Sequence, residues 1–166
     1  LWFTDKDYKE KGTHIKWNPA VKTVKDRAVL WEALLDDRLD VIATDHAPHT
    51  LYEKSKSYLK APSGGPLVQH ALLALLEKVK EMLLPIEKLV EKACHNPAKI
   101  FQIEKRGFIR EGYFADIVLV DLNAPQTVCK ENILYKCGWS PFEGVCFSSS
   151  VTQTFVNGVL VFDNGV

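Results

Sequence analysis

The feature that most constrains the fold is an apolar run of strand length, Leu39-Asp-Val-Ile-Ala-Thr44, in which polar and apolar residues do not alternate. Such runs are typical of strands buried on both faces, as in a parallel sheet. A shorter strand-like run at 14–18 stops at Pro19, and a Thr23–Asp26 capping box between the two runs predicts a helix that ends near Asp37. The order strand, helix, strand predicts a parallel α/β fold.

The chain downstream divides into a helical part and a part rich in short strands. A polar loop, 50–65, leads into a predicted helix at 67–84, and Pro85 and Asn96-Pro97 each begin a further helix. After Gln102 we expect strands at 107–112, 115–120, 152–158 and 159–162, with Asn157-Gly158 as the turn of a hairpin. We therefore expect two domains, residues 1–103 and 104–166.

Composition excludes several classes of partner. The chain carries 21 basic and 21 acidic residues, so it has no general electrostatic attraction to nucleic acid or to an anionic membrane. No apolar run approaches the roughly 20 residues that span a bilayer, and the first residues are charged, so a cytoplasmic location is the default. None of the four cysteines forms a CxxC pair, and we expect ordinary reduced thiols. Because Leu1 stands where an initiator methionine is expected, we interpret the chain as a fragment.

Candidate chemistry lies at the end of the apolar run, in Asp45-His-Ala-Pro-His49. Working residues of parallel α/β folds collect at the carboxyl ends of strands. A carboxylate there can bind a metal or act as a general acid or base beside one. Spacing alone leaves open that Asp45 caps the loop and that His46 and His49 are surface residues.

Two further segments are candidates for the same site. Asn18 follows the first strand-like run, and its amide offers both a donor and an acceptor to a polar ligand. Ser63-Gly-Gly65 precedes a helix, where free backbone N–H groups suit a carboxylate or a ring carbonyl. For Asn18 an ordinary turn before a helix is an equal alternative, and a single Gly-rich turn is only a weak signal of a binding site. We expect structural roles for the remaining histidines, His14, His70 and His95.

Together these motifs resemble the dihydroorotases of the amidohydrolase superfamily across nearly the whole chain. Thr44-Asp-His-Ala-Pro-His49 is similar to the family's TDHAPH signature, and Asn18-Pro-Ala-Val-Lys22 resembles its NPPLR segment, with Ala20 and Lys22 as departures. Other matching segments are Ala61-Pro-Ser-Gly64, Asn96 to Phe101, Gly107 to Val118 and Ser140-Pro-Phe-Glu-Gly144. Asn18 and His49 are residues that hydantoinases and allantoinases usually lack, which favours dihydroorotate as substrate.

The resemblance implies a fold, cofactors and residue roles. The chain would be the C-terminal part of a TIM-like (β/α)8 barrel followed by a small β-sandwich module, and the complete enzyme would hold one or two zinc ions. Asp45 would be a metal ligand and the catalytic residue that takes and returns a proton as dihydroorotate opens to N-carbamoyl-aspartate. Asn18, His49 and the backbone at Gly64 would bind the substrate.

The resemblance also implies that part of the site lies elsewhere. The family's His-x-His pair and its other metal ligands would lie upstream, and one carboxylate is too few ligands for a catalytic zinc site. We therefore expect the isolated chain to be inactive, to bind zinc weakly if at all, and to associate with its missing N-terminal part or with itself through an exposed barrel face. The alternatives are a hydantoinase, dihydropyrimidinase or allantoinase, or a non-catalytic homologue that acts as a scaffold.

Overall fold

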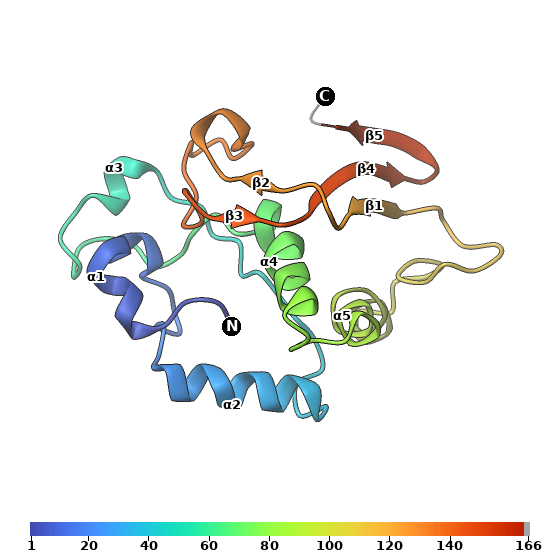
Figure 1. Cartoon of the computed structure of the whole chain (residues 1–166), viewed down its shortest axis with the longest axis horizontal. Coiled ribbons are helices and arrows are strands. Elements are labelled where there is room, and N and C mark those ends of the chain that lie inside the picture. The colour runs from blue at the N-terminus through green and yellow to red at the C-terminus, as the bar shows by residue number, and fades with distance from the viewer. Residues whose placement is uncertain (165–166) are drawn as a thin grey trace. The chain divides into compact units, whose positions relative to one another are not determined.

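The computed structural model describes residues 1–164 (Figure 1). They form two compact units. Each unit is assembled from separate stretches of the chain. The first contains residues 1–38, 44–72 and 127–145, and the described residues of the second are 39–43, 73–126 and 146–164. The expected boundary at residue 103 concerns the domains of the complete protein and stays a prediction.

The first unit is built from short helices and 3-10 turns around an aromatic core. These elements are η1 (Asp5–Asp7), α1 (Tyr8–Lys11), η2 (Gly12–Ile15), α2 (Val24–Leu35), α3 (Leu51–Lys54) and η4 (Lys130–Asn132). The ring of Phe3 lies 5.2 Å from that of Phe142 and 5.5 Å from that of Trp17, centroid to centroid. Ile15 and Trp139 are also buried in this unit. This core holds the loops that carry the candidate residues.

Helix α2 begins where the sequence predicts it. The Thr23 hydroxyl accepts a hydrogen bond from the Asp26 amide, and the Asp26 carboxylate accepts one from the Thr23 amide, so the predicted capping box is confirmed. The helix ends at Leu35, close to the expected end, because the chain reverses into positive φ at Asp37.

Four helical elements follow, and the longest is shorter than expected. Their bounds are α4 (Val68–Lys80), α5 (Ile86–Val90), the π-helical turn η3 (Glu91–His95) and α6 (Asn96–Ile100). Helix α4 was predicted to reach residue 84, but Met82 has a φ of 57°, which is incompatible with a continuing right-handed helix. The helix start after Pro85 is confirmed, whereas the expected cap at Asn96 is wrong, because the backbone stays helical through His95 and Asn96 and the Asn96 side-chain amide donates to the Asp40 carbonyl.

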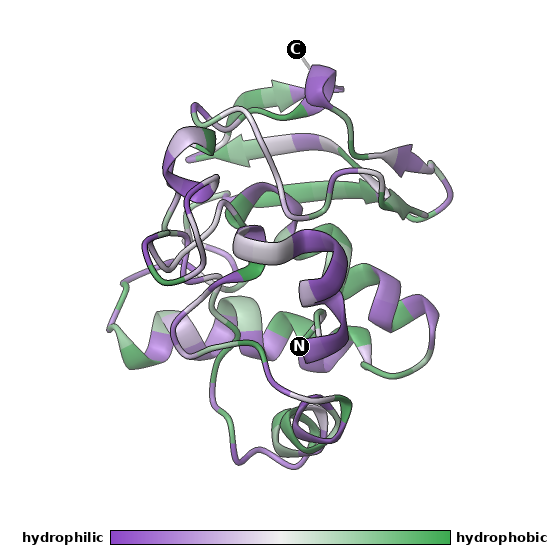
Figure 2. Cartoon of the chain, turned by 90° about the vertical axis from the view of Figure 1, so that its left-hand side faces the viewer, coloured by the Kyte–Doolittle hydropathy of each residue, from purple (hydrophilic) through white to green (hydrophobic). Residues whose placement is uncertain are grey.

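The second unit contains a three-stranded antiparallel sheet in the order β1-β4-β5. Its strands are β1 (Ile117–Asp121), β4 (Ser150–Val156) and β5 (Val159–Asp163), and a separate pair joins β2 (Gln126–Thr127) and β3 (Cys146–Phe147). The predicted hairpin is confirmed, with φ values of 53° at Asn157 and 79° at Gly158, as its two-residue turn requires. Apolar residues run along the strands near the C-terminus (Figure 2).

Three predicted strands are wrong. Residues 14–18 form the end of η2 and an irregular segment, residues 39–44 join no ladder, and residues 107–112 form turns. In the described chain the only parallel pairing is a single bridge between His46 and Gly65. A strand is completed by a ladder of hydrogen bonds to a neighbouring strand, and within residues 1–164 the first two segments make only isolated backbone hydrogen bonds, such as that from the Ile42 amide to the Lys92 carbonyl. Within the described residues the run at 39–44 is neither paired nor buried, so its apolar pattern predicted neither property here.

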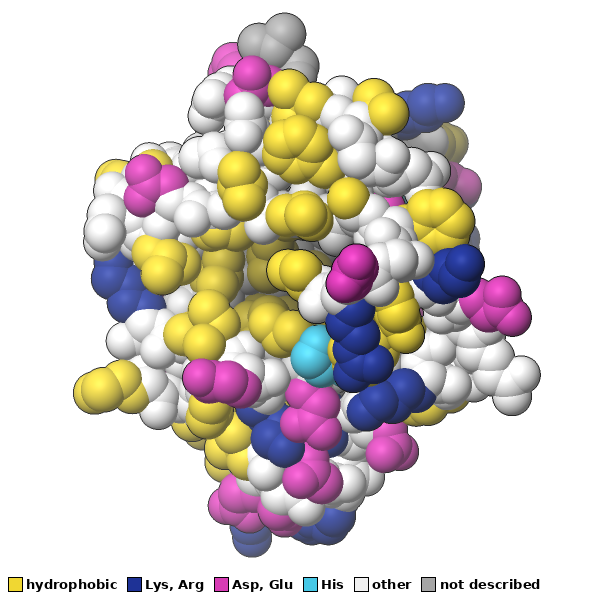
Figure 3. Space-filling view, turned by 90° about the vertical axis from the view of Figure 1, so that its right-hand side faces the viewer, with side chains coloured by type: hydrophobic (Ala, Val, Ile, Leu, Met, Phe, Trp, Pro, Cys, Tyr) yellow, Lys and Arg dark blue, Asp and Glu magenta, His cyan; other side chains and the backbone are white. Residues whose placement is uncertain are grey.

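Many large apolar side chains are exposed (Figure 3). On α2 these are Val24, Val29 and Leu30, and on the three-stranded sheet they include Val159 and Val161. Among the described helices, none is both long and apolar enough to cross a membrane.

Candidate active site

The turn that begins at Asp45 is anchored to the loop before α4. The Ala47 amide donates to the Gly65 carbonyl over 3.2 Å, next to the His46–Gly65 bridge. His46 Nδ1 lies 3.0 Å from the Leu67 amide and 3.3 Å from the Val68 amide, so it accepts from the N–H groups that open α4. This capping role explains His46, which the sequence placed only on the turn.

Asp45 itself is exposed and has a φ of 48°. In residues 1–164 no side chain or backbone group forms a hydrogen bond or an ion pair with its carboxylate. Positive φ is uncommon for a residue with a side chain, and Asp adopts it more readily than most. The turn therefore presents a carboxylate with open coordination positions.

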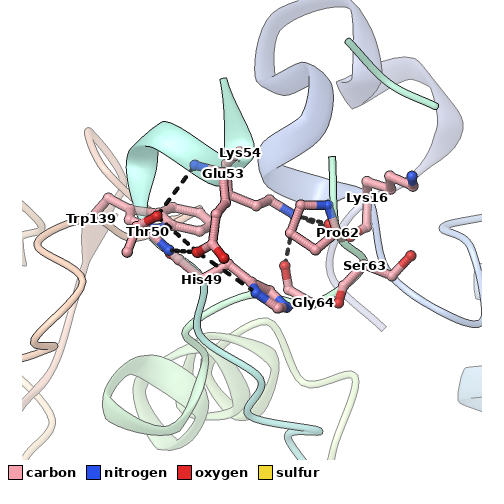
Figure 4. Close-up of polar contacts among 9 residues, drawn as sticks. All are labelled: Lys16, His49, Thr50, Glu53, Lys54, Pro62, Ser63, Gly64 and Trp139. Atoms are coloured by element: carbon pink, nitrogen blue, oxygen red, sulfur yellow. Dashed lines mark hydrogen bonds and ion pairs between the residues drawn. The ribbon is translucent and has the colours of Figure 1, made fainter. Parts of the chain in front are cut away.

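His49 is half-buried and held on two sides (Figure 4). Its Nε2 lies 3.1 Å from the Ser63 carbonyl, and its own carbonyl accepts from Trp139 Nε1 over 2.7 Å. Because a carbonyl only accepts, Nε2 carries a proton, and in the neutral ring Nδ1 is left as an acceptor. Nδ1 lies 4.0 Å from the Glu53 carboxylate, which becomes an ion pair when the ring is protonated.

Gly64 packs tightly against this turn. A Cβ at position 64 would lie 2.6 Å from the Ala47 carbonyl oxygen and 3.2 Å from His49 Cδ2, and the φ of 131° also requires glycine. Its amide donates to the Lys16 carbonyl over 3.0 Å, and its carbonyl accepts from Lys54 Nζ over 2.8 Å. The Gly64 N–H is thus engaged within the protein, while its carbonyl keeps a second lone pair for a ligand.

Asn18 is exposed, and no described group hydrogen-bonds to its side chain. The backbone just before it is tied to the loop at Gly64 through the Lys16 carbonyl, which accepts from the Gly64 amide and from Lys54 Nζ. The segments that carry Asn18, His49 and Gly64 therefore meet at one loop, although the strands expected to bring them together are missing.

A hollow of about 490 Å³ adjoins the turn. One wall comes from residues 46–53, including both histidines and Glu53, and the other comes from residues 134–137, including Tyr135 and Cys137. The residues of this second wall were not candidates from their sequence pattern. No spacing signal could have identified them, since the two walls lie far apart in the sequence.

The other histidines lie against aromatic rings. His14 stacks on Trp139 at 4.7 Å, and burial followed by the charge of Lys54 lowers its pKa. His70 is buried with Nδ1 3.1 Å from Ser140 Oγ, and burial lowers its pKa to about 4. His95 stacks on Phe108 at 4.2 Å. These surroundings suit the structural roles expected for all three.

The described residues do not form a metal site by themselves. Within residues 1–164, no group of three or more His, Cys, Asp or Glu side chains is placed to hold an ion. Asp45 has open coordination positions, whereas His46 Nδ1 is engaged by two backbone amides. A metal here would need further ligands from outside the described chain.

Comparison with known proteins identifies the family. Residues 5–161 match the model of the amidohydrolase family. The chain belongs to the amidohydrolase family. It is similar to the dihydroorotases of Halobacterium salinarum, with 37% identity over 98% of the chain, and of Acetivibrio thermocellus, with 41% identity over 95% of the chain.

Solved amidohydrolase-like structures share the α/β fold of the chain. An L-hydantoinase (dihydropyrimidinase) from Arthrobacter aurescens matches with a TM-score of 0.92 and 29% identity over 99% of the chain. A dihydropyrimidinase from Brevibacillus agri matches with a TM-score of 0.90 and 25% identity. The chain spans 38% of the length of the Halobacterium dihydroorotase and 38% of the Arthrobacter hydantoinase.

Proposed function

We propose that the complete protein is a dihydroorotase, which opens the cyclic amide of dihydroorotate to N-carbamoyl-aspartate, and closes it in reverse, in pyrimidine synthesis. The observation that carries the proposal is the likeness of almost the whole chain to dihydroorotases, including 37% identity to the Halobacterium protein. The exposed carboxylate of Asp45, beside His49 and the loop at Gly64, supports it.

In this proposal the C-terminal part of a TIM-like barrel and a small β-sandwich module are completed by the missing N-terminal part of the protein. That part would supply the remaining metal ligands, with Asp45 as the ligand from this chain. Zinc, when bound, would activate water and polarise the ring carbonyl. The chain alone is expected to be inactive. A cytoplasmic location and self-association through the exposed apolar faces remain predictions.

The residues of this chain would bind the ring and move a proton. Asp45 would accept a proton from the attacking water and return it to the ring nitrogen as the C–N bond breaks. The Asn18 amide and His49 Nδ1 would contact the polar groups of the substrate, and the second lone pair of the Gly64 carbonyl would accept from a ring N–H. Fixing the ring in this way lowers the entropic part of the barrier.

A hydantoinase or dihydropyrimidinase is the second candidate. The TM-score of 0.92 with the Arthrobacter L-hydantoinase favours it, since the same arrangement of elements serves a different cyclic amide there. An allantoinase would hydrolyse its ring by the same chemistry. A non-catalytic homologue would keep the fold as a scaffold and hydrolyse no ring.

The test is an assay of the complete protein on dihydroorotate, hydantoin, dihydrouracil and allantoin. We expect dihydroorotate to be opened with the highest kcat/KM. The Asp45→Asn variant should lose about 10²- to 10⁴-fold in kcat because it cannot take up the proton. Asp36→Asn, which removes an exposed carboxylate paired with Arg38, should keep wild-type activity. Preference for another ring would favour the second candidate, and no turnover of any ring would favour the scaffold.

A further inference from the structure

Lys54 is a buried cation whose amine meets the loop at Gly64. Its side chain has a relative exposure of 0%, and it belongs to α3, which begins two residues after His49. Nζ donates to the carbonyls of Pro62 at 3.0 Å and Gly64 at 2.8 Å, and more distantly to that of Lys16 at 3.3 Å (Figure 4). The ring of Trp139 lies 5.9 Å from the same nitrogen.

The number of donors matches the number of acceptors. An ammonium group has three N–H donors, and each meets one carbonyl. No carboxylate within the described residues forms an ion pair with Lys54, so only carbonyl dipoles and the ring of Trp139 offset its charge. Burial, followed by the nearby charge of Lys16, lowers its pKa to about 8. A charge in such surroundings is costly, and an apolar side chain would fill the space at lower cost.

The three carbonyls belong to the segments that carry the proposed substrate ligands. Lys16 stands two residues before Asn18, and Pro62 and Gly64 flank Ser63, whose carbonyl meets His49 Nε2. One ammonium group therefore ties together the three stretches of chain that the proposed function needs side by side.

A second lysine holds the other half of the same loop. Lys16 Nζ donates to the Tyr58 and Ala61 carbonyls, each over 2.6 Å, and lies 5.0 Å from the Tyr58 ring centroid. The loop from residue 58 to residue 64 thus has little regular structure of its own and is held in shape by two amines that bind its carbonyls. Removing either amine would leave two or three of these carbonyls without their donor.

We propose that Lys54 is a positioning residue for substrate binding and that Lys16 assists it. Its ammonium group holds the loop at Gly64 and the backbone before Asn18 against the His49 turn, so that the binding groups are in place before a cyclic amide arrives. The inference rests on the proposed function and deepens it. Lys54 acts through Gly64 and Asn18 and does not touch the substrate itself.

The test uses Lys54→Met in the complete protein, which keeps the length of the side chain and removes its donors. We expect KM for the ring substrate to rise at least 10-fold while kcat changes less than about 3-fold. Backbone hydrogen exchange in residues 58–64 should accelerate at least 10-fold without substrate, with little change elsewhere. Lys56→Met is the matched control, because the amine of Lys56 lies over the Tyr52 ring and binds none of these carbonyls.

Two results with Lys54→Met would overturn the proposal, and a third result, with the wild-type protein, separates it from the proposed function. Unchanged KM and unchanged exchange in Lys54→Met would overturn it, as would exchange that accelerates evenly along the chain, which indicates a purely structural role. If Lys54→Met does not fold, Lys16→Met replaces it in the test. We then expect a smaller rise in KM and a smaller acceleration of exchange in residues 58–64, and unchanged KM and exchange would overturn the proposal. If the wild-type protein opens no ring, the proposed function fails, and the exchange measurement alone decides the role of Lys54.

Discussion

The indole nitrogen of Trp139 donates a hydrogen bond to the carbonyl of His49 over 2.7 Å, across 90 residues of sequence. Trp139 also stacks on His14 and is itself buried, so its position is set by packing. The hydrogen bond from Trp139 therefore fixes the position of the His49 carbonyl. The segment after residue 127 is therefore part of the site's framework, although none of its residues was a candidate from sequence.

Replacing Trp139 with Phe should weaken substrate binding. The change keeps an aromatic ring but removes the donor to the His49 carbonyl, and a typical hydrogen bond contributes about 0.5 to 1.5 kcal/mol. We expect KM to rise about 2- to 10-fold with a smaller change in kcat, measured by steady-state kinetics of the complete protein. Trp17→Phe is the control, since Trp17 Nε1 is buried without a hydrogen-bond partner among the described residues. Equal effects of the two substitutions would contradict a specific role for the Trp139 bond.

Gly64→Ala should disturb the site more than an ordinary glycine substitution does. The new Cβ would lie 2.6 Å from the Ala47 carbonyl oxygen, at a φ of 131°. Something must move, and the neighbours are the backbone of the Asp45 turn and the His49 ring, so we expect kcat/KM to fall at least about 10-fold together with a loss of stability of about 2 kcal/mol or more. Gly138→Ala is the control, because Gly138 also has positive φ but has nothing within 4 Å of its Cβ position. It therefore measures the cost of backbone strain without a steric clash. If both variants lose the same activity, close packing at Gly64 is not the cause.

His70 should make the protein less stable at mildly acidic pH. Burial lowers its pKa from 6.5 to about 4, so between these values the unfolded chain binds the proton and the folded chain does not. The protonation of His70 in the unfolded chain does not lower the free energy of unfolding well above pH 6.5. As the pH falls toward 4 it lowers this free energy progressively, by about 2 kcal/mol at pH 5. Urea unfolding of the complete protein at pH 7 and pH 5 measures it. His70→Gln should reduce the difference between the two pH values, and His95→Gln should not; an unchanged difference in His70→Gln would refute the assignment.

Local features could be predicted because their interactions lie within a few residues. The Thr23–Asp26 box starts α2, the Asn157-Gly158 turn joins β4 to β5, and Pro85 precedes α5, each as expected. The Asp45–His49 turn was also recognised locally, from its residues and from its likeness to a family signature. The strand expected at 39–44 failed because a strand depends on a neighbour that may lie anywhere in the sequence.

The sequence by itself determined the family, the main helices, the C-terminal hairpin and the carboxylate most suited to the chemistry. Only the tertiary structure decided how the binding segments are held: Lys54 reads as one more charge in a polar loop, yet its amine is buried among carbonyls from residues 16, 62 and 64. Trp139 likewise meets His49 only through the fold. The physical reason is that caps and turns depend on neighbours along the chain, whereas burying a charge depends on which distant backbone groups the fold brings around it.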